Sequence, residues 1–201
     1  MTKAQWRSNR SKTTSWTSFC FSGKVTVKVT KLQRTFSTCR ILPSSYRIKA
    51  RIAGNAVTFE LDKPRKVAVE FDNDITHPML VFAEELEQNI PDQNNTNVVY
   101  FAPGVHDIGD AYSISSNKTV YLAGGAYVKG KFKSNYANNI KIMGRGILSG
   151  EQYAHKTGHM IRFRECRNVL IEGITIINSP EFNISLRGSN HTVRNVKMIG
   201  W

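Results

Sequence analysis

The stretch Asn139-Ile140-Lys141-Ile142-Met143-Gly144 decides the fold, because similar six-residue phrases recur between Asn117 and Trp201. The other copies are residues 119–124, 168–173 and 195–200. In each copy apolar side chains alternate with polar or small ones and a Gly follows, which is typical of a short strand with one buried face. Copies that recur at a period of roughly 20 to 30 residues cannot bury that face alone and must stack on one another. The pattern therefore predicts a parallel β-solenoid.

The first two copies align without a gap beyond the phrase itself. With Thr119 placed on Asn139, Tyr127 falls on Ile147. We therefore expect successive coils to stack in this register, with the Val, Ile and Leu positions forming ladders inside the solenoid. The fourth copy begins as the sequence ends, and an unfinished coil leaves unpaired backbone groups and an open apolar end. We therefore expect the chain to be a truncated, N-terminal fragment of a longer solenoid.

Short strand patterns with turn signals precede the repeats. They cover residues 25–29, 46–52, 56–61, 67–71 and 79–82. Gly54-Asn55 separates two of these runs, and a two-residue Gly-Asn connection favours a hairpin because Gly tolerates positive φ. The density of strands predicts a small antiparallel β-sandwich over residues 19–90, followed by a charged, Asn-rich linker and then by the solenoid over residues 97–201. Residues 1–18 are rich in Ser, Thr and Arg and are expected to be disordered or irregular.

The chain has 201 residues and a formal charge of +13, with no Asp or Glu in residues 1–59. Lysines alternate with valines in residues 24–30, which indicates the solvated face of a half-buried strand more than a nucleic-acid patch, since aromatic residues are not interleaved. A basic surface also suits an acidic polysaccharide. Arg162, Arg164 and Glu165 are expected to form an ordinary surface ion pair. No apolar run has the length of a membrane span, so a membrane is not an expected partner. Nucleic acid is not an expected partner either, because the lysines fit a solvated strand face.

The cysteines and histidines give no metal or disulfide framework. Cys20, Cys39 and Cys166 are odd in number and lack a Cys-x-x-Cys spacing, so we expect free thiols, although Cys20 and Cys39 could pair if their strands are neighbours. His106 and Asp107 are adjacent, and adjacent residues of a strand point to opposite faces. We therefore expect no metal and no cofactor.

Motifs along the second half of the chain carry a family resemblance. They are Pro103-Gly104-Val105-His106-Asp107-Ile108-Gly109, residues 119–130, Gly144-Arg145-Gly146-Ile147-Leu148-Ser149-Gly150-Glu151 and Ile177-Asn178-Ser179-Pro180. Together they resemble the opening coils of pectin-lyase-fold glycoside hydrolases, above all family 49 (dextranase and isopullulanase) and family 28 (polygalacturonases). The earlier segments Lys63-Pro64-Arg65-Lys66 and Val69-Glu70-Phe71-Asp72 resemble the N-terminal β-sandwich of family 49 dextranases. The resemblance implies an all-β protein in which a β-sandwich precedes a right-handed parallel β-helix.

The resemblance also implies an activity, the hydrolysis of O-glycosidic bonds in a polysaccharide with inversion at the anomeric carbon. Such enzymes use one carboxylic acid to protonate the leaving oxygen and one carboxylate to activate water on the opposite face. In these families the catalytic aspartates are commonly first met one coil after the Asn-Ser-Pro segment, which places them beyond Trp201. No catalytic residue is therefore assigned, and the chain alone is expected to be inactive.

Further expectations follow from the same resemblance. The substrate is expected to be a dextran-like α-glucan or a pectic polymer. The full-length protein is expected to be an extracellular or periplasmic monomer, although the chain shows no signal peptide.

Four residues, Glu181, Asn183, Tyr153 and His155, are the main candidates for substrate contact. Glu181 and Asn183, together with Ser185, alternate on the strand after Ser179-Pro180, where outward side chains would lie one coil below the expected aspartates; the alternative is a solvated strand face. Tyr153 and His155 lie in the connection 152–159 and could supply a stacking platform and a polar contact, because loops on one face of a solenoid often bind ligands.

Two other function classes remain open. A non-catalytic carbohydrate-binding or adhesin module is compatible with a rigid β-helix that lacks an assigned acid and base. A polysaccharide lyase would need a calcium cluster together with a Lys or Arg base. The coil after Trp201 discriminates among the three, since spaced aspartates indicate hydrolysis and an acidic cluster with a basic partner indicates elimination.

Overall fold

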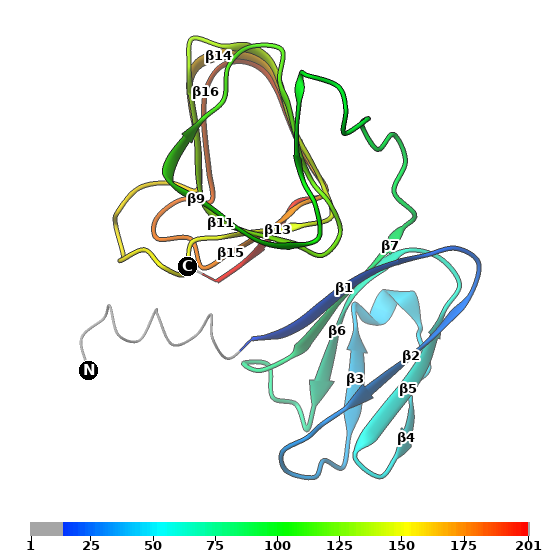
Figure 1. Ribbon diagram of the computed structural model, residues 1–201. Coiled ribbons are helices and arrows are strands. Elements are labelled where there is room, and N and C mark those ends of the chain that lie inside the picture. The colour runs from blue at the N-terminus through cyan, green and yellow to red at the C-terminus, as the bar shows by residue number, and fades with distance from the viewer. Residues whose placement is uncertain (1–13, 201) are drawn as a thin grey trace. The chain divides into compact units, whose positions relative to one another are not determined.

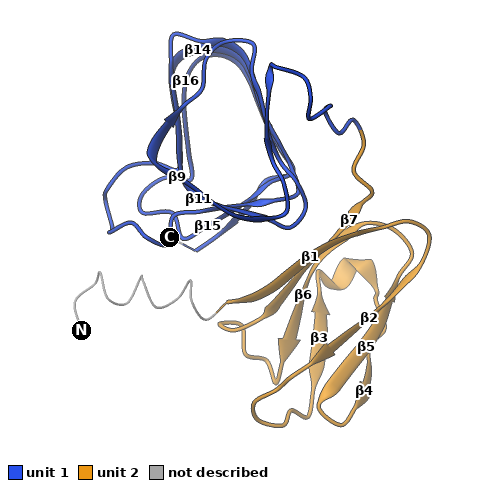
Figure 2. Ribbon diagram, viewed as in Figure 1, with its two compact units in different colours: residues 1–12, 89–201 blue, residues 13–88 orange. Residues whose placement is uncertain are grey.

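The computed structural model describes residues 14–200, which fall into two compact units, residues 14–88 and residues 89–200 (Figure 2). Both units are built from β-strands, and one short 3-10 turn, Ser44–Tyr46, interrupts the strands of the described chain. The predicted all-β class is therefore confirmed.

The unit of residues 14–88 is a β-sandwich of two sheets. The larger sheet contains β1 (Ser15–Phe21), β7 (Met79–Glu85), β6 (Arg65–Phe71) and β3 (Cys39–Leu42), in that order. The smaller sheet contains β2 (Val25–Thr30), β5 (Ala56–Leu61) and β4 (Arg51–Ala53) (Figure 1). Alternating apolar side chains from both sheets form one core that includes Val57, Phe59, Val69 and Val81. The β1–β7 pair is parallel, whereas the β2–β5, β4–β5, β3–β6 and β6–β7 pairs are antiparallel.

Several local predictions can be compared with this sandwich. The hairpin at Gly54-Asn55 is confirmed, because Ala53 pairs with Ala56 across it. The prediction of irregular structure is wrong for residues 15–18, which belong to β1 and pair with β7; residues 1–13 lie outside the described residues. The run 46–52 is not one strand, since a 3-10 turn begins it and only its last residues form β4. The sheet order places Cys20 and Cys39 on opposite edge strands, and both thiols are free.

The unit of residues 89–200 is a parallel β-helix with three faces, whose strands superimpose on three sides in Figure 1. Face 1 contains β8 (Val98–Phe101), β10 (Thr119–Leu122), β12 (Asn138–Gly144) and the second halves of β14 (Ile161–Glu172) and β16 (Ile184–Arg194). Face 2 contains the first halves of β9 (Gly104–Ser113) and β11 (Ala126–Asn135), then β13 (Ile147–Ser149), β15 (Thr175–Ile177) and β17 (Lys197–Ile199). Face 3 contains the second halves of β9 and β11 and the first halves of β14 and β16. All of these pairs are parallel.

Apolar ladders fill the interior of the β-helix. Val120, Ile142 and Ile171 stack on face 1, Val128, Leu148 and Ile176 stack on face 2, and Phe132 stacks on Ile161 on face 3. All eight side chains are fully buried. Burial of this kind contributes about 1.5–3 kcal/mol for each large apolar side chain, so the repeats stabilise one another as the sequence predicts.

The register of the repeats is confirmed on one face and wrong on another. Tyr127 pairs with Ile147 on face 2, as predicted. On face 1, however, Thr119 pairs with Lys141 and not with Asn139. Four residues separate Leu122 from Tyr127, whereas two separate their partners Gly144 and Ile147, so the register shifts by two between face 1 and face 2. The fourth phrase lies on face 2, where Lys197 pairs with Thr175.

An asparagine ladder lines the turn that enters face 1. Asn117, Asn139 and Asn168 all have positive φ, which Asn tolerates better than most residues. The Asn139 amide donates to Asn117 Oδ1 at 2.9 Å, and the Asn168 amide donates to Asn139 Oδ1 at 3.1 Å. The ladder therefore joins three successive coils.

We expect Asn139→Ala to lower the free energy of unfolding by about 2 kcal/mol, because it removes two side-chain hydrogen bonds and places Ala at positive φ. Asn139→Gly removes the same bonds but accepts the backbone conformation, so its loss should be smaller. Urea denaturation measures both. Equal losses for the two variants would show that the backbone conformation contributes nothing.

Candidate functional site

Two connections meet at the corner between face 2 and face 3. The first is the loop of residues 150–160, yellow in Figure 1, and the second is the segment 178–183 that enters β16. Backbone hydrogen bonds join them, from Lys156 N to Pro180 O at 2.8 Å and from Met160 N to Phe182 O at 3.0 Å. Because both connections leave the regular coil at the same corner, they bring polar and aromatic side chains together on its outside.

The centre of this corner is formed by His159, Glu181, Phe182 and Asn183, which we call the corner surface. His159 Nδ1 lies 3.2 Å from Glu181 Oε2, so protonation of the imidazole would make an ion pair, although this nitrogen is not aligned for a hydrogen bond. The rings of His159 and Phe182 have centroids 5.0 Å apart, and Phe182 is 63% exposed. An exposed aromatic ring beside a carboxylate offers a sugar both a stacking face and a hydrogen-bond acceptor.

Buried polar atoms without partners lie next to this surface. Ser179 Oγ and Asn183 Oδ1 are inaccessible to solvent and accept or donate no hydrogen bond among the described residues. Native structures satisfy most buried polar atoms, so such atoms call for an explanation. A ligand hydroxyl group is one partner that would satisfy them.

The loop is anchored by a buried lysine. Lys131 Nζ donates to Asp110 Oδ1 and to Thr157 O, both at 2.7 Å, and lies 3.9 Å from the centre of the Tyr153 ring. The lysine side chain is only 6% exposed. Burial raises the pKa of the Tyr153 phenol, and the negative charges of Asp110 and Asp107 raise it further. Tyr153 therefore covers Lys131, and this contact occupies one side of the ring that was predicted to be a stacking platform.

A second network fixes the start of the same loop. Tyr127 Oη donates to Glu151 Oε2 at 2.7 Å and lies 3.0 Å from Ser149 Oγ, and Lys129 Nζ lies 3.5 Å from Glu151 Oε1. Partial burial is the main cause that raises the pKa of the Tyr127 phenol. The loop is thus held at both ends by side chains of β11.

The four predicted contact residues differ in their placement. Glu181 and Asn183 lie together in the corner surface, Tyr153 packs on Lys131, and His155 is exposed with no contact to the other three within the described chain. Sequence reasoning missed His159 and Phe182. The signal available for both was their position two residues before Ile161 and Ile184, the apolar residues that open face 3 on β14 and β16.

We expect Lys131→Met to free the loop of residues 150–160, because it removes the cation that holds Asp110, Thr157 and Tyr153 together. Limited proteolysis should then cleave within this loop at least about tenfold faster, which corresponds to about 1.4 kcal/mol of lost local stability. Lys141→Met, which removes an exposed lysine of β12, is the matched control. An unchanged cleavage rate in Lys131→Met would contradict the anchoring role.

His106 and Asp107, which the sequence also suggests as a possible site, make local contacts. His106 Nε2 contacts Ala102 O at 2.7 Å, and Asp107 Oδ1 accepts a hydrogen bond from Gly109 N, so both have local structural roles. In residues 14–200 no group of three His, Cys, Asp or Glu side chains is placed to hold a metal ion. The same residues contain no helix that is long and apolar enough to cross a membrane.

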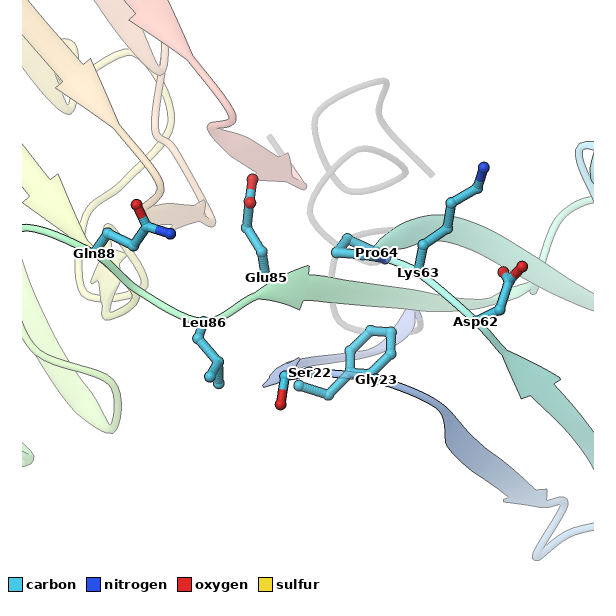
Figure 3. A pocket seen from close by; sticks show the side chains of 9 residues that line it. Ser22, Gly23, Asp62, Lys63, Pro64, Glu85, Leu86 and Gln88 are labelled. Carbon is cyan, nitrogen blue, oxygen red and sulfur yellow. The ribbon is translucent and has the colours of Figure 1, made fainter.

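The β-sandwich contains an open hollow, which Figure 3 shows from close by. It is lined by Phe21, Ser22, Gly23, Asp62, Lys63, Pro64, Glu85, Leu86 and Gln88. Phe21 gives this hollow a single aromatic ring, and within the described residues no buried polar atom without a hydrogen-bond partner lines it. The corner surface is therefore the better candidate.

Known proteins resemble this chain in sequence and in structure. No family model matches the chain. A dextranase from Arthrobacter globiformis is 25% identical over an alignment that covers 98% of this chain and 45% of the relative, and the isopullulanase of Aspergillus niger is 31% identical over 74% of this chain and 33% of the relative. The solved structure of Dex49A from Penicillium minioluteum matches with a TM-score of 0.77 and 20% identity, over 92% of this chain and 47% of that one.

The chain thus spans less than half the length of the relatives it matches. The structural match shows a shared sandwich and β-helix fold, and the sequence matches join the chain to proteins named dextranase and isopullulanase. The chain is therefore related to proteins named dextranase and isopullulanase, in agreement with the predicted resemblance to family 49, and it has the fold of Dex49A.

Proposed function

We propose that the chain is part of a secreted glycoside hydrolase that cleaves polysaccharide O-glycosidic bonds with inversion, and that its corner surface binds the substrate. The relatives named dextranase and isopullulanase support a glucan substrate such as dextran, and a pectic polymer is the alternative. The observation that carries the binding role is the exposed Phe182 beside Glu181 and the partnerless Asn183 Oδ1.

Inversion requires an acid and a base on opposite sides of the scissile bond, with room between them for water. Glu181 faces His159 and no second carboxylate accompanies it in the corner surface. We therefore propose that the catalytic aspartates lie beyond residue 201, and that Glu181 and Asn183 orient the sugar. In this role they act as substrate contacts and transfer no proton.

The binding role is tested by titrating the full chain with dextran and with pectic oligosaccharides, using tryptophan fluorescence or calorimetry. Phe182→Ala should weaken binding by about fivefold or more, since a stacked aromatic contact contributes about 1 kcal/mol. Tyr136→Ala is the matched control, because Tyr136 is 79% exposed and lies at another corner of the β-helix. Equal affinities for both variants and the wild type would contradict the assignment of the corner surface.

A further inference from the structure

Four cationic side chains point outward from face 3 beside the corner surface. They are Lys133 on β11, Arg162 and Arg164 on β14, and Arg187 on β16. Each one follows a buried or partly buried residue of the core, namely Phe132, Ile161, Phe163 or Leu186, so alternation along the strand directs it to the outside. We call these four residues the cationic column.

The column is compact because the strands are neighbours. Lys133 and Arg162 are directly opposite in the β11–β14 ladder, and adjacent strands lie about 4.8 Å apart. Arg162 is opposite Ser185 on β16. In the sequence, Ser185 lies between Asn183 of the corner surface and Arg187 of the column. At the bulge between β14 and β16, Arg164 and Glu165 face Arg187. The column is thus continuous with the corner surface.

The column is not neutralised by the protein. Within residues 14–200 none of its four side chains forms an ion pair, and Glu165 in the bulge forms none either, so the predicted pairing among Arg162, Arg164 and Glu165 is wrong. Of the other carboxylates, Asp110 pairs with Lys131, and Glu181 Oε2 lies 3.2 Å from His159 Nδ1 in the corner surface. Like charges opposite one another in a sheet are destabilising. Four cationic side chains that lie side by side without an ion-pair partner in the described residues therefore suit a ligand of opposite charge.

We propose that the cationic column binds the carboxylate or sulfate groups of an acidic polysaccharide whose neighbouring sugar lies on the corner surface. The proposal rests on the proposed function and narrows its substrate to a charged polymer. Arginine suits this role, because its planar guanidinium donates two parallel hydrogen bonds to one carboxylate or sulfate group. Single-stranded nucleic acid is the weaker fit, since the outward positions of the column carry Lys, Arg, Ser and Asn and no aromatic ring on which successive bases would stack.

The test compares four polymers in affinity electrophoresis: polygalacturonate, dextran sulfate, neutral dextran and oligothymidylate. The wild-type chain should bind polygalacturonate or dextran sulfate at least about tenfold more tightly than dextran, with an affinity that falls as salt rises. The preferred polymer identifies the group, carboxylate or sulfate. The variant R162Q/R164Q should lose at least about tenfold, whereas K28Q/R51Q, which removes the same charge from exposed positions of the sandwich, should change affinity less than about twofold.

The outcomes separate this proposal from the proposed function. Tight binding of dextran that R162Q/R164Q leaves unchanged would overturn the charged-polymer inference and leave a neutral-glucan hydrolase intact. Equal losses in the two double variants, or binding of oligothymidylate as tight as that of the acidic glycans, would show a general effect of net charge and also overturn it. Failure to bind any of the glycans would reject both the inference and the proposed function.

Discussion

Gly144→Ala is expected to lower the free energy of unfolding by more than about 4 kcal/mol, or to abolish folding altogether. Gly144 ends β12 with φ +125°, a conformation that residues with a Cβ rarely adopt. A Cβ at this position would lie 2.0 Å from Leu122 O and 2.8 Å from Leu122 C in the preceding coil. Relief would require the two coils to separate, because the obstructing atoms are backbone. Urea denaturation followed by circular dichroism measures the loss.

Gly104→Ala is the matched control for the clash. Gly104 has φ +130°, nearly the value of Gly144, but a Cβ there meets nothing within 4 Å. Its loss should be limited to backbone strain of about 1–3 kcal/mol. If the two variants lost the same stability, the close stacking of coils at Leu122 and Gly144 would not determine the effect.

Phe163→Ala is expected to lower the free energy of unfolding by about 3–5 kcal/mol, because it opens a cavity in a densely packed interior. Phe163 is fully buried on face 3 and belongs to the same core as Phe132 and Met160. Deletion of this ring removes contacts to neighbouring coils that cannot close the space without breaking their own ladders. Chemical denaturation by urea gives the loss directly.

Phe182→Ala supplies the contrast. Phe182 is exposed, so its substitution should change the free energy of unfolding by less than about 0.5 kcal/mol while it weakens sugar binding. The opposite pattern, in which Phe182→Ala unfolds the protein and Phe163→Ala does not, would contradict the assignment of Phe163 to the interior and of Phe182 to the surface.

The sequence predicted those parts of the fold that depend on local patterns. Alternation and the Gly-Asn turn identified the sandwich strands, and the repeat identified the solenoid and the register of Tyr127 on Ile147. The register of face 1 was not predictable in this way, because it depends on the length of each turn. Two additional residues between Leu122 and Tyr127, relative to the stretch between their partners Gly144 and Ile147, shift Thr119 onto Lys141.

The corner surface was predictable only in part. Glu181 and Asn183 were found from an expected strand pattern, but the prediction that they lie on that strand is wrong, because β16 begins only at Ile184 and both residues lie in the connection before it. His159 and Phe182 were missed, since their contact joins two connections whose meeting depends on how the coils stack. The burial of Lys131 beneath Tyr153 depends on the path of an irregular loop, which no periodic pattern specifies.

The most direct test of the account is reducing-end release from dextran, pullulan, dextran sulfate and polygalacturonate by the protein that the complete gene encodes, with the anomer of the new end followed by NMR. We predict release from at least one of these polymers, with the anomeric configuration inverted, so that an α-linked polymer first yields the β-anomer. Release with retention of configuration, or no release from any of these polymers by a folded protein, would contradict the assignment as an inverting polysaccharide hydrolase.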